Sequence, residues 1–259
     1  MATYLDKILA RHREVAATDS RALDALVEQA KACAPTRGFR SALVGGDELR
    51  VISEIKRRSP SKGALNADLD PAEMARRYEL GGASCLSVLT DVEHFGGSVA
   101  DLQAARAACS LPVLRKDFTV SANDVCDARI MGADCVLLIA AALEPAELAD
   151  FHALATEIGL DVLVEIHDER ELEHALAARA TLVGVNQRDL VTFQVDHERA
   201  VRMAGVIPNS AVKVAESGVR GPDDARSLRA AGYDAVLVGE TLVTAADPTA
   251  ALQALRVRA

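Results

Sequence analysis

Six polar side chains stand at or near the ends of short apolar runs, in a pattern suited to acid/base catalysis; they are Glu54, Lys56, Lys116, Glu165, Asn186 and Glu216. Residues two positions apart on an extended chain face the same side, so Lys116 points with Leu114 and Glu165 points with Leu163. This shared alternation predicts that the six side chains converge. We expect a neighbouring lysine to lower a lysine pKa and burial to raise a glutamate pKa, which brings both groups toward neutral pH. A lysine here can also act as a Schiff-base nucleophile, and spacing alone does not separate the two roles.

Glycines at two further strand ends predict a site for an anion. Gly218 follows one apolar run and Gly239 lies at the end of the next. A residue without a side chain lets backbone N–H groups approach a phosphate closely. The backbone N–H of Glu240 can donate to the same anion while its carboxylate points away.

A basic segment, residues 56–63, follows the first apolar run. In a chain whose formal net charge is −9, we expect this segment to recruit and cover an anionic substrate. Lys56 can supply a direct charge to the anion. Arg188, which is in phase with Asn186, can hold a carboxylate.

Eight short apolar runs alternate with longer Ala-rich helical stretches from about residue 50 onward. The runs cover residues 50–56, 85–90, 112–118, 135–140, 162–167, 182–187, 212–217 and 235–240. Runs that are apolar on both faces and are separated by amphipathic helices indicate parallel β-α-β units. Eight such units predict an α/β fold, a closed (β/α)8 TIM barrel whose active site lies at the carboxyl ends of the strands. A doubly wound open sheet is the alternative.

Residues 1–49 precede the first run and carry two helical patterns. We expect this N-terminal helical extension to pack over one end of the barrel, within a single domain that spans residues 1–259. Neither pattern has a strongly basic face, which disfavours a helix that lies on a membrane surface.

The composition excludes several classes of protein. The chain has 29 basic and 38 acidic residues, 3% aromatic residues and five cysteines. This balance is not that of a nucleic-acid binder, and the longest apolar run is too short to span a membrane. The charged N-terminus and the lack of a CxxC pair predict a cytoplasmic protein with reduced thiols.

A metal site is not expected. Glu165 and His167 share a face, but no second spaced pair of ligands supports them. The other histidines, which include His12 and His94, are expected at the surface or in packing.

Eight motifs, taken in this order, resemble those of the indole-3-glycerol phosphate synthase family. They are EIKRRSPSKG (54–63), SVLTD (87–91), FGGS (95–98), LRKDF (114–118), LVEIH (163–167), GVNQRDL (184–190), AESGV (215–219) and VLVGE (236–240). The resemblance, which also covers the N-terminal extension, implies a carboxy-lyase of tryptophan biosynthesis. Its substrate would be 1-(2-carboxyphenylamino)-1-deoxyribulose 5-phosphate, which loses carbon dioxide and water to give indole-3-glycerol phosphate. It implies no cofactor. The expected partner is this phosphorylated small molecule, and neither nucleic acid nor a membrane is expected to bind. The protein would be a monomer or weak homodimer.

The resemblance also implies roles for individual residues. Lys116 would be the general acid that protonates the ketone oxygen, and Glu165 would assist proton removal and the later dehydration. Glu54, Lys56, Asn186 and Glu216 would complete the catalytic site. The phosphate cradle would comprise Ser217, Gly218, Gly239 and the backbone of Glu240, a position where many relatives carry serine. Ser59 and Arg188 would lie near the substrate carboxylate, and the anthranilate ring would contact Leu89, Phe95, Phe118 and Leu190.

Two alternatives remain open on the residues alone. One is another phosphate-binding barrel enzyme, such as a phosphoribosylanthranilate isomerase or a Schiff-base aldolase, which borohydride would trap on Lys116 or Lys56. The other is a non-catalytic barrel that binds a phosphorylated metabolite. Simple phosphate binding needs none of the carboxylates, which argues against the second alternative.

Overall fold

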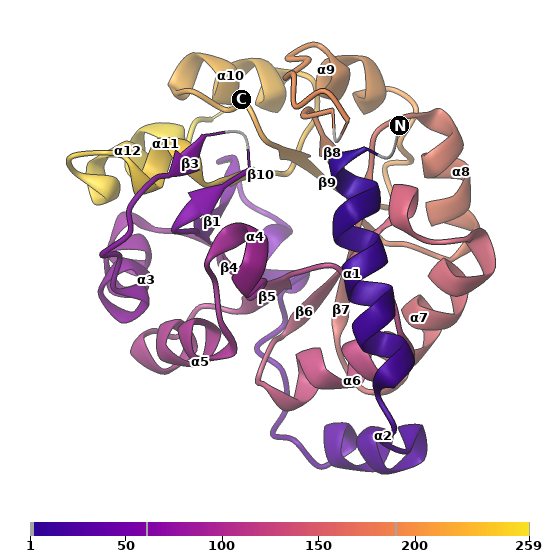
Figure 1. The fold of residues 1–259 in the computed structure, drawn as a ribbon. Helices are drawn as coiled ribbons and strands as arrows, with labels where there is room; N and C mark the ends of the chain where they lie inside the picture. Colours follow the sequence, from indigo (N-terminus) through magenta and orange to yellow (C-terminus); the bar gives the residue numbers. More distant parts are fainter. Residues whose placement is uncertain (1–2, 61, 190, 259) are drawn as a thin grey trace.

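Eight parallel strands close into a barrel in the computed structural model, which describes residues 3–60, 62–189 and 191–258 (Figure 1). The strands are β1 (Arg50–Ile55), β4 (Cys85–Leu89), β5 (Val113–Lys116), β6 (Cys135–Ile139), β7 (Asp161–Ile166), β8 (Leu182–Asn186), β9 (Val212–Glu216) and β10 (Ala235–Val238). They follow one another around the ring in chain order, and β10 pairs with β1 to close it. The predicted (β/α)8 barrel is confirmed, and each of its strands lies within a predicted run except β7, which begins one residue earlier, at Asp161.

Helices surround this barrel and connect its strands (Figure 1). The larger ones are α3 (Pro71–Gly81), α5 (Val99–Ala108), α6 (Ala122–Ile130), α7 (Pro145–Glu157), α8 (Glu169–Ala177), α9 (Arg199–Ala204), α10 (Pro222–Ala230) and α12 (Pro248–Leu255). Local sequence explains where they begin. The Asp70 side chain accepts hydrogen bonds from the backbone N–H groups of Ala72 and Glu73, and Ser121 caps α6 in the same way through Asp124. None of the described helices is long and apolar enough to cross a membrane.

Alternating residues of each strand contribute to two separate cores. Ile52, Leu114, Leu163 and Val214 pack inside the barrel, whereas their neighbours, such as Val113, pack between the strands and the helices. The six polar residues that the sequence predicts to converge are in phase with this inward-facing set, at every second position along the chain. The side chains that continue this set beyond the inner core therefore point into the mouth.

The floor of the barrel is closed by the segment that leads into β1. Phe39 and Leu43, the latter in the 3₁₀ turn η1 (Ser41–Leu43), are buried in the inner core. The backbone N–H of Arg40 donates to Asp161 Oδ2 at 2.8 Å, at the amino end of β7. This apolar plug lies at the end opposite the active-site mouth.

The N-terminal segment also reaches the mouth. Helix α1 (Tyr4–Thr18) crosses in front of the barrel, and α2 (Leu23–Lys31) descends beside α6 (Figure 1). Arg13 of α1 donates to both carboxylate oxygens of Glu147, at 3.0 and 2.9 Å, and to the carbonyl of Ala142. The segment thus lies against both ends of the barrel, whereas the sequence predicted contact with one end.

Four short elements lie in the loops at the mouth or beside it. They are the hairpin β2 (Arg58–Ser59) and β3 (Gly63–Ala64), the turn helix α4 (Val92–Phe95), the 3₁₀ turn η2 (Ala140–Ala142) and α11 (Glu240–Val243). The hairpin, which the sequence did not predict, pairs Arg58 with Ala64 and Ser59 with Gly63 after β1.

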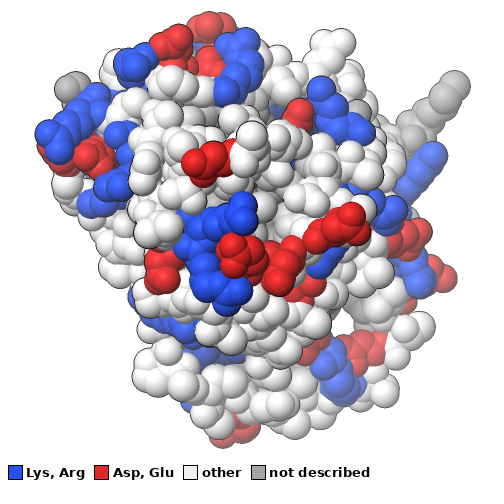
Figure 2. All heavy atoms as spheres, turned by 90° about the vertical axis from the view of Figure 1, so that its left-hand side faces the viewer, with Lys and Arg blue, Asp and Glu red and all other residues white. Residues whose placement is uncertain are grey.

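Acidic and basic side chains are interspersed on the face that bears α3, rather than gathered by sign (Figure 2). On α3 itself, Glu73 lies 2.9 Å from Arg77 and 3.3 Å from Arg76. Exposed pairs of this kind contribute little to stability.

Candidate active site

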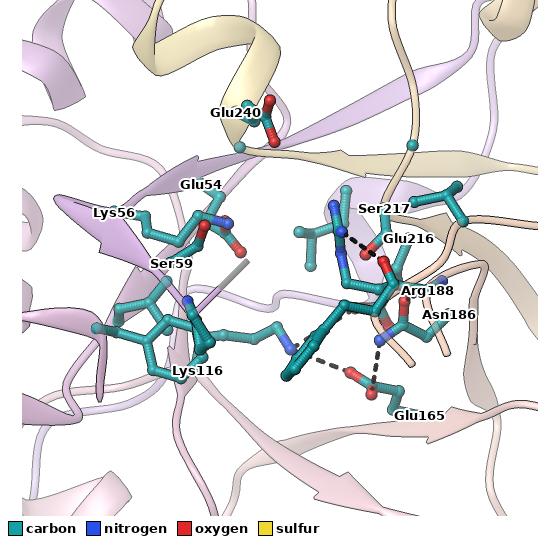
Figure 3. A pocket seen from close by; sticks show the side chains of 18 of the residues that line it. Glu54, Lys56, Ser59, Lys116, Glu165, Asn186, Arg188, Glu216, Ser217 and Glu240 are labelled. Carbon is teal, nitrogen blue, oxygen red and sulfur yellow. Dashed lines mark hydrogen bonds and ion pairs between the residues drawn. The ribbon is translucent and has the colours of Figure 1, made fainter. Parts of the chain in front are cut away.

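A cavity of about 490 Å³ opens at the carboxyl ends of the strands. Its described lining includes nearly all the residues predicted from sequence: Glu54, Lys56, Ser59, Leu89, Phe95, Lys116, Phe118, Glu165, Asn186, Arg188, Glu216, Ser217, Gly218, Gly239 and Glu240. The structure therefore brings these residues together around one space (Figure 3). The remaining predicted residue, Leu190, lies outside the described residues.

Lys116, Glu165, Asn186 and Glu216 form a hydrogen-bonded cluster in this cavity. Lys116 Nζ donates to Glu165 Oε2 at 3.0 Å and lies 3.9 Å from Glu216 Oε2. Asn186 Nδ2 donates to the other oxygen, Glu165 Oε1, at 2.9 Å. Figure 3 shows the lysine and the amide pointing at Glu165 from opposite sides. The ammonium group and the carboxylate are thus held in fixed positions toward the cavity.

The cluster holds Lys116 in its charged form. Burial alone would lower its pKa, but the attraction of Glu165, Glu216 and Glu54 outweighs burial and raises the pKa above the usual range. The prediction of a lowered lysine pKa is therefore wrong for Lys116, because carboxylates rather than a second ammonium group surround it.

The pKa values of the two neighbouring carboxylates, Glu216 and Glu165, shift in opposite directions. Burial and the charge of Glu165 raise the pKa of Glu216 to about 8, although Lys116 opposes this. Burial alone would also raise the pKa of Glu165, but Lys116, His167 and the Asn186 hydrogen bond together lower it. These shifts favour an ionised Glu165 and a protonated Glu216 near neutral pH. The predicted upward shift occurs for Glu216 and not for Glu165.

Two glycines leave room for the carboxylates. A Cβ atom on Gly184 would lie 2.0 Å from Glu216 Oε1, and one on Gly239 would lie 2.1 Å from Glu54 Oε1. Glu54 also forms an ion pair with Lys56. The sequence predicted only an anion-approach function for Gly239 and none for Gly184. The structure shows that both positions must lack a side chain for these glutamates to fit.

Loops after β9 and β10 meet at one side of the mouth. Ser217 and Gly218 both have left-handed backbone, with φ of 66° and 73°. Gln187 Nε2 donates to the Ser217 carbonyl at 2.7 Å, which fixes the turn. Glu240 is the first residue of α11, and its carboxylate lies 3.7 Å from Lys62 Nζ. This cation offsets the negative charge that Glu240 would otherwise present to an anion.

The basic segment after β1 divides into two groups. Lys56, Ser59 and Lys62 line the cavity. Arg57 instead pairs with Asp101 of α5, and Arg58 donates to carbonyl groups at α4. The prediction that the whole segment receives substrate is therefore wrong for the two arginines, which anchor the hairpin.

Several lining residues were missed in the sequence. Tyr4, Leu5 and Ile8 of α1 cover the mouth, and Phe193 and His197 come from the loop before α9. The apolar spacing on α1 was visible, but it indicates a buried face without saying what that face covers. The Tyr4 and Phe193 rings pack edge to face, with centroids 5.3 Å apart.

His12 joins α1 to two strand ends. Its Nε2 lies 3.1 Å from Asp91 Oδ2 and 3.9 Å from Asp117 Oδ1. The three ligand atoms lie close enough to hold a metal ion. They are already engaged, since Asp117 Oδ1 also accepts from the backbone N–H of Phe118 at 2.8 Å and Asp91 Oδ2 also lies 3.2 Å from His94 Nδ1. This donor set therefore fits an ion-pair anchor for α1, a role the sequence did not predict.

Comparisons with known proteins identify the family. Residues 5–255 match the family model described as "Indole-3-glycerol phosphate synthase". A protein of that name from Paenarthrobacter aurescens is 52% identical over 227 residues, covering 86% of this chain and 84% of its own length. Another from Leptothrix cholodnii is 47% identical over 260 residues, covering 98% of this chain and 99% of its own.

Solved structures of more distant proteins share the fold. Thiamine phosphate pyrophosphorylase from Pyrococcus furiosus has a TM-score of 0.60 and 18% identity, covering 80% of this chain and 93% of its own. An N-acetylmannosamine-6-phosphate 2-epimerase from Clostridium perfringens has a TM-score of 0.59 and 13% identity, covering 74% and 86%. At these identities the likeness concerns the barrel alone.

Proposed function

The chain belongs to the indole-3-glycerol phosphate synthase family and is a carboxy-lyase of tryptophan biosynthesis, and we propose that the Lys116–Glu165 cluster performs its ring closure. The substrate is 1-(2-carboxyphenylamino)-1-deoxyribulose 5-phosphate. A bond forms between the ring carbon that bears the carboxylate and the ketone carbon, carbon dioxide leaves, and the former ketone oxygen departs as water.

Lys116 acts as the general acid in this proposal. Its ammonium group lies in the cavity, and its raised pKa keeps it charged at neutral pH. As the ring carbon attacks, negative charge develops on the ketone oxygen. A positioned cation in a largely buried site stabilises that charge and delivers the first proton.

Glu165 acts as the base. The Asn186 amide and the Lys116 ammonium hold its two oxygens, at 2.9 and 3.0 Å, and its lowered pKa keeps it ready to accept a proton. Dehydration delivers a second proton to the departing oxygen and removes one from the new ring. Because two protons are supplied and one is recovered, each turnover takes one proton from solvent.

The rest of the cavity binds the two ends of the substrate. We assign the phosphate to the backbone of Ser217, Gly218, Gly239 and Glu240, and the carboxylate to Ser59 and Arg188, with Lys56 between the anionic groups. Leu89, Phe95 and Phe118 form an apolar wall for the aromatic ring, and the two phenylalanine rings lie 6.3 Å apart. Holding both ends brings the reacting carbons together, which is a large part of catalysis in a ring closure.

One observation carries this assignment of roles: the Lys116 ammonium group and the Glu165 carboxylate, 3.0 Å apart, face a cavity that has the left-handed Ser217–Gly218 turn at its edge. The test is an assay with the substrate in the presence of a chelator, following indole fluorescence. The chain has no tryptophan, so its background is low. We expect full activity with chelator and no covalent adduct after borohydride. An adduct on Lys116 would overturn the general-acid role in favour of Schiff-base chemistry.

We further propose that residues 1–49 and the barrel form a single domain, acting as a monomer or weak homodimer in the cytoplasm. Helix α1 contacts α7 through Arg13 and Glu147, and it contacts the end of β4 through His12 and Asp91, which supports the single domain. The five cysteines are free, which fits a reducing compartment. A single unfolding transition by circular dichroism and the mass by light scattering test these two points.

A further inference from the structure

His167 lies behind Glu165 and takes no part in the reaction as proposed above. It follows the last residue of β7, and its Nε2 atom is 3.8 Å from Glu165 Oε1. This nitrogen is buried and has no hydrogen-bond partner among the described residues. A buried imidazole nitrogen that faces a catalytic carboxylate without a partner calls for a functional explanation.

The other side of the imidazole leads away from the cavity. His167 Nδ1 lies 3.0 Å from Glu171 Oε2, and the backbone N–H of His167 donates to the same oxygen at 2.7 Å. Glu171 lies in the first turn of α8, on the outside of the barrel. Side-chain exposure rises along this line, from 1% for Glu165 to 12% for His167 and 18% for Glu171. The three groups thus lead from the buried base toward solvent through His167 and Glu171, neither of which is among the described residues that line the cavity.

The charges around His167 favour a proton on it. Burial opposes the imidazolium form, but Glu171 and Glu165 outweigh burial and raise the pKa, while Arg199 of α9 acts against them. Arg199 itself donates to the carbonyl of Asn186 at 3.0 Å and lies 4.0 Å from Asp189. His167 is therefore more protonated near neutral pH than a free histidine would be.

The other neighbours of Glu165 cannot supply a proton from solvent. The Asn186 amide does not titrate, and Lys116 has just given up its own proton when a new one is needed. Glu216 is buried at 2% exposure and faces the same cavity. A bound substrate would cover that cavity, with α1 across its mouth.

We propose that His167 is a proton-relay residue that reloads the Lys116–Glu165 pair from solvent once in each turnover. The imidazolium gives its Nε2 proton to Glu165, and Glu165 passes a proton to the neutral Lys116 amine. The neutral imidazole left behind keeps its Nδ1 proton toward Glu171. Its ring then turns so that the bare Nε2 reaches water beside Glu171, takes up a proton there, and turns back toward Glu165. Every proton donated is replaced, so the chain returns to its starting state. This inference rests on the ring closure proposed above, which consumes one proton.

The test compares His167→Gln with a matched control, His174→Gln, which lies on α8 three residues beyond Glu171. We expect kcat to fall about tenfold in His167→Gln with KM within twofold, while the control keeps both values, since a single proton-transfer group contributes about 10²–10⁴-fold at most and water can partly replace a relay. The solvent isotope effect on kcat should rise. In His167→Ala, imidazole added to the buffer should restore part of kcat, an effect that a structural role would not give.

A second variant keeps the relay testable if His167→Gln folds poorly. Glu171→Gln retains an oxygen that can accept from both His167 N–H groups but lacks the negative charge that favours the imidazolium. We expect a smaller fall in kcat, again with a larger isotope effect. Unchanged kcat in both variants, or a fall without isotope effect and imidazole rescue, would overturn the relay. Absence of product from the unmodified enzyme would instead overturn the ring-closure proposal.

Discussion

The two ends of the barrel are built from the same strands but satisfy their polar groups differently. At the floor, Asp134 is fully buried and accepts from the backbone N–H groups of Arg37 and Val113, both at 2.8 Å, and pairs with Arg106. At the mouth, Glu216 Oε1 and His167 Nε2 are buried without a hydrogen-bond partner among the described residues. Completed hydrogen bonds stabilise Asp134 at the floor, whereas these two atoms at the mouth stay available for a substrate or a proton.

The largest expected contrast concerns two buried lysines. Lys116→Met should lower kcat about a thousandfold, because it removes the proposed general acid, and substrate binding should remain within a few-fold. Its control is Lys213→Met, near the amino end of β9, where Nζ donates to the last carbonyl of α9 at 2.8 Å. That change should cost about 1 kcal/mol of stability and leave kcat within twofold.

Steady-state kinetics and urea unfolding of both lysine variants separate these effects. Near-normal turnover in Lys116→Met would remove the residue from its assigned role. A large loss of turnover in Lys213→Met would show that the two ends are not energetically distinct.

The floor should respond in the opposite way. Phe39→Ala removes a fully buried ring from the plug and should lower the free energy of unfolding by about 3–5 kcal/mol. At 25 °C the folded fraction should keep its kcat within twofold. Urea unfolding followed by circular dichroism, with activity measured on the same sample, checks this. A kcat loss above tenfold in protein that remains folded would contradict the assignment of stability to the floor and of catalysis to the mouth.

Glu216→Gln tests whether the mouth gives up stability for function. The pKa of Glu216 is raised to about 8, so the folded state holds a proton that the unfolded chain loses near its ordinary pKa. Stability due to this group therefore falls as pH rises from about 4.5 to 8. Gln has no proton to lose, so the variant should gain about 1–3 kcal/mol relative to the unmodified protein between pH 6 and pH 9. Its kcat should fall.

Urea midpoints at several pH values give this comparison directly. Equal pH slopes for the variant and the unmodified protein would mean that Glu216 is ionised throughout, and its proposed state would be wrong.

The smallest effect is expected at His12, which anchors α1. Burial opposes its charge, but Asp91 and Asp117 raise its pKa, so its stabilising effect is complete below about pH 6.5 and is lost as pH rises through the raised value. His12→Gln should cost about 0.5–1 kcal/mol at pH 6 and little at pH 9. His152 is a control of opposite sign, since burial lowers its pKa. Stability curves of His12→Gln and His152→Gln with parallel pH dependence would contradict both assignments.

The strands and the convergent residues were predictable because a period of two fixes which side chains face inward. Lys116, Glu165 and Asn186 follow from that rule once the strand ends are located, and the motifs resembling a known family add their roles. The rule says nothing about partners in other elements. The pairing of Arg57 with Asp101, of His12 with Asp91 and of His167 with Glu171 depends on loops and helices whose placement comes from tertiary packing. The lysine pKa was predicted wrongly for the same reason, since its sign depends on how many carboxylates surround it.

The position of α1 has a consequence for the order of events at the ribosome. Tyr4 and His12 are synthesised well before their partners Asp91, Asp117 and Phe193. Helix α1 must therefore wait, undocked, while most of the barrel is translated, because domains acquire their long-range contacts only after the chain that makes them is available. A helix made before the barrel is thus docked only after it, and the catalytic mouth gains its cover only when the barrel beneath it exists.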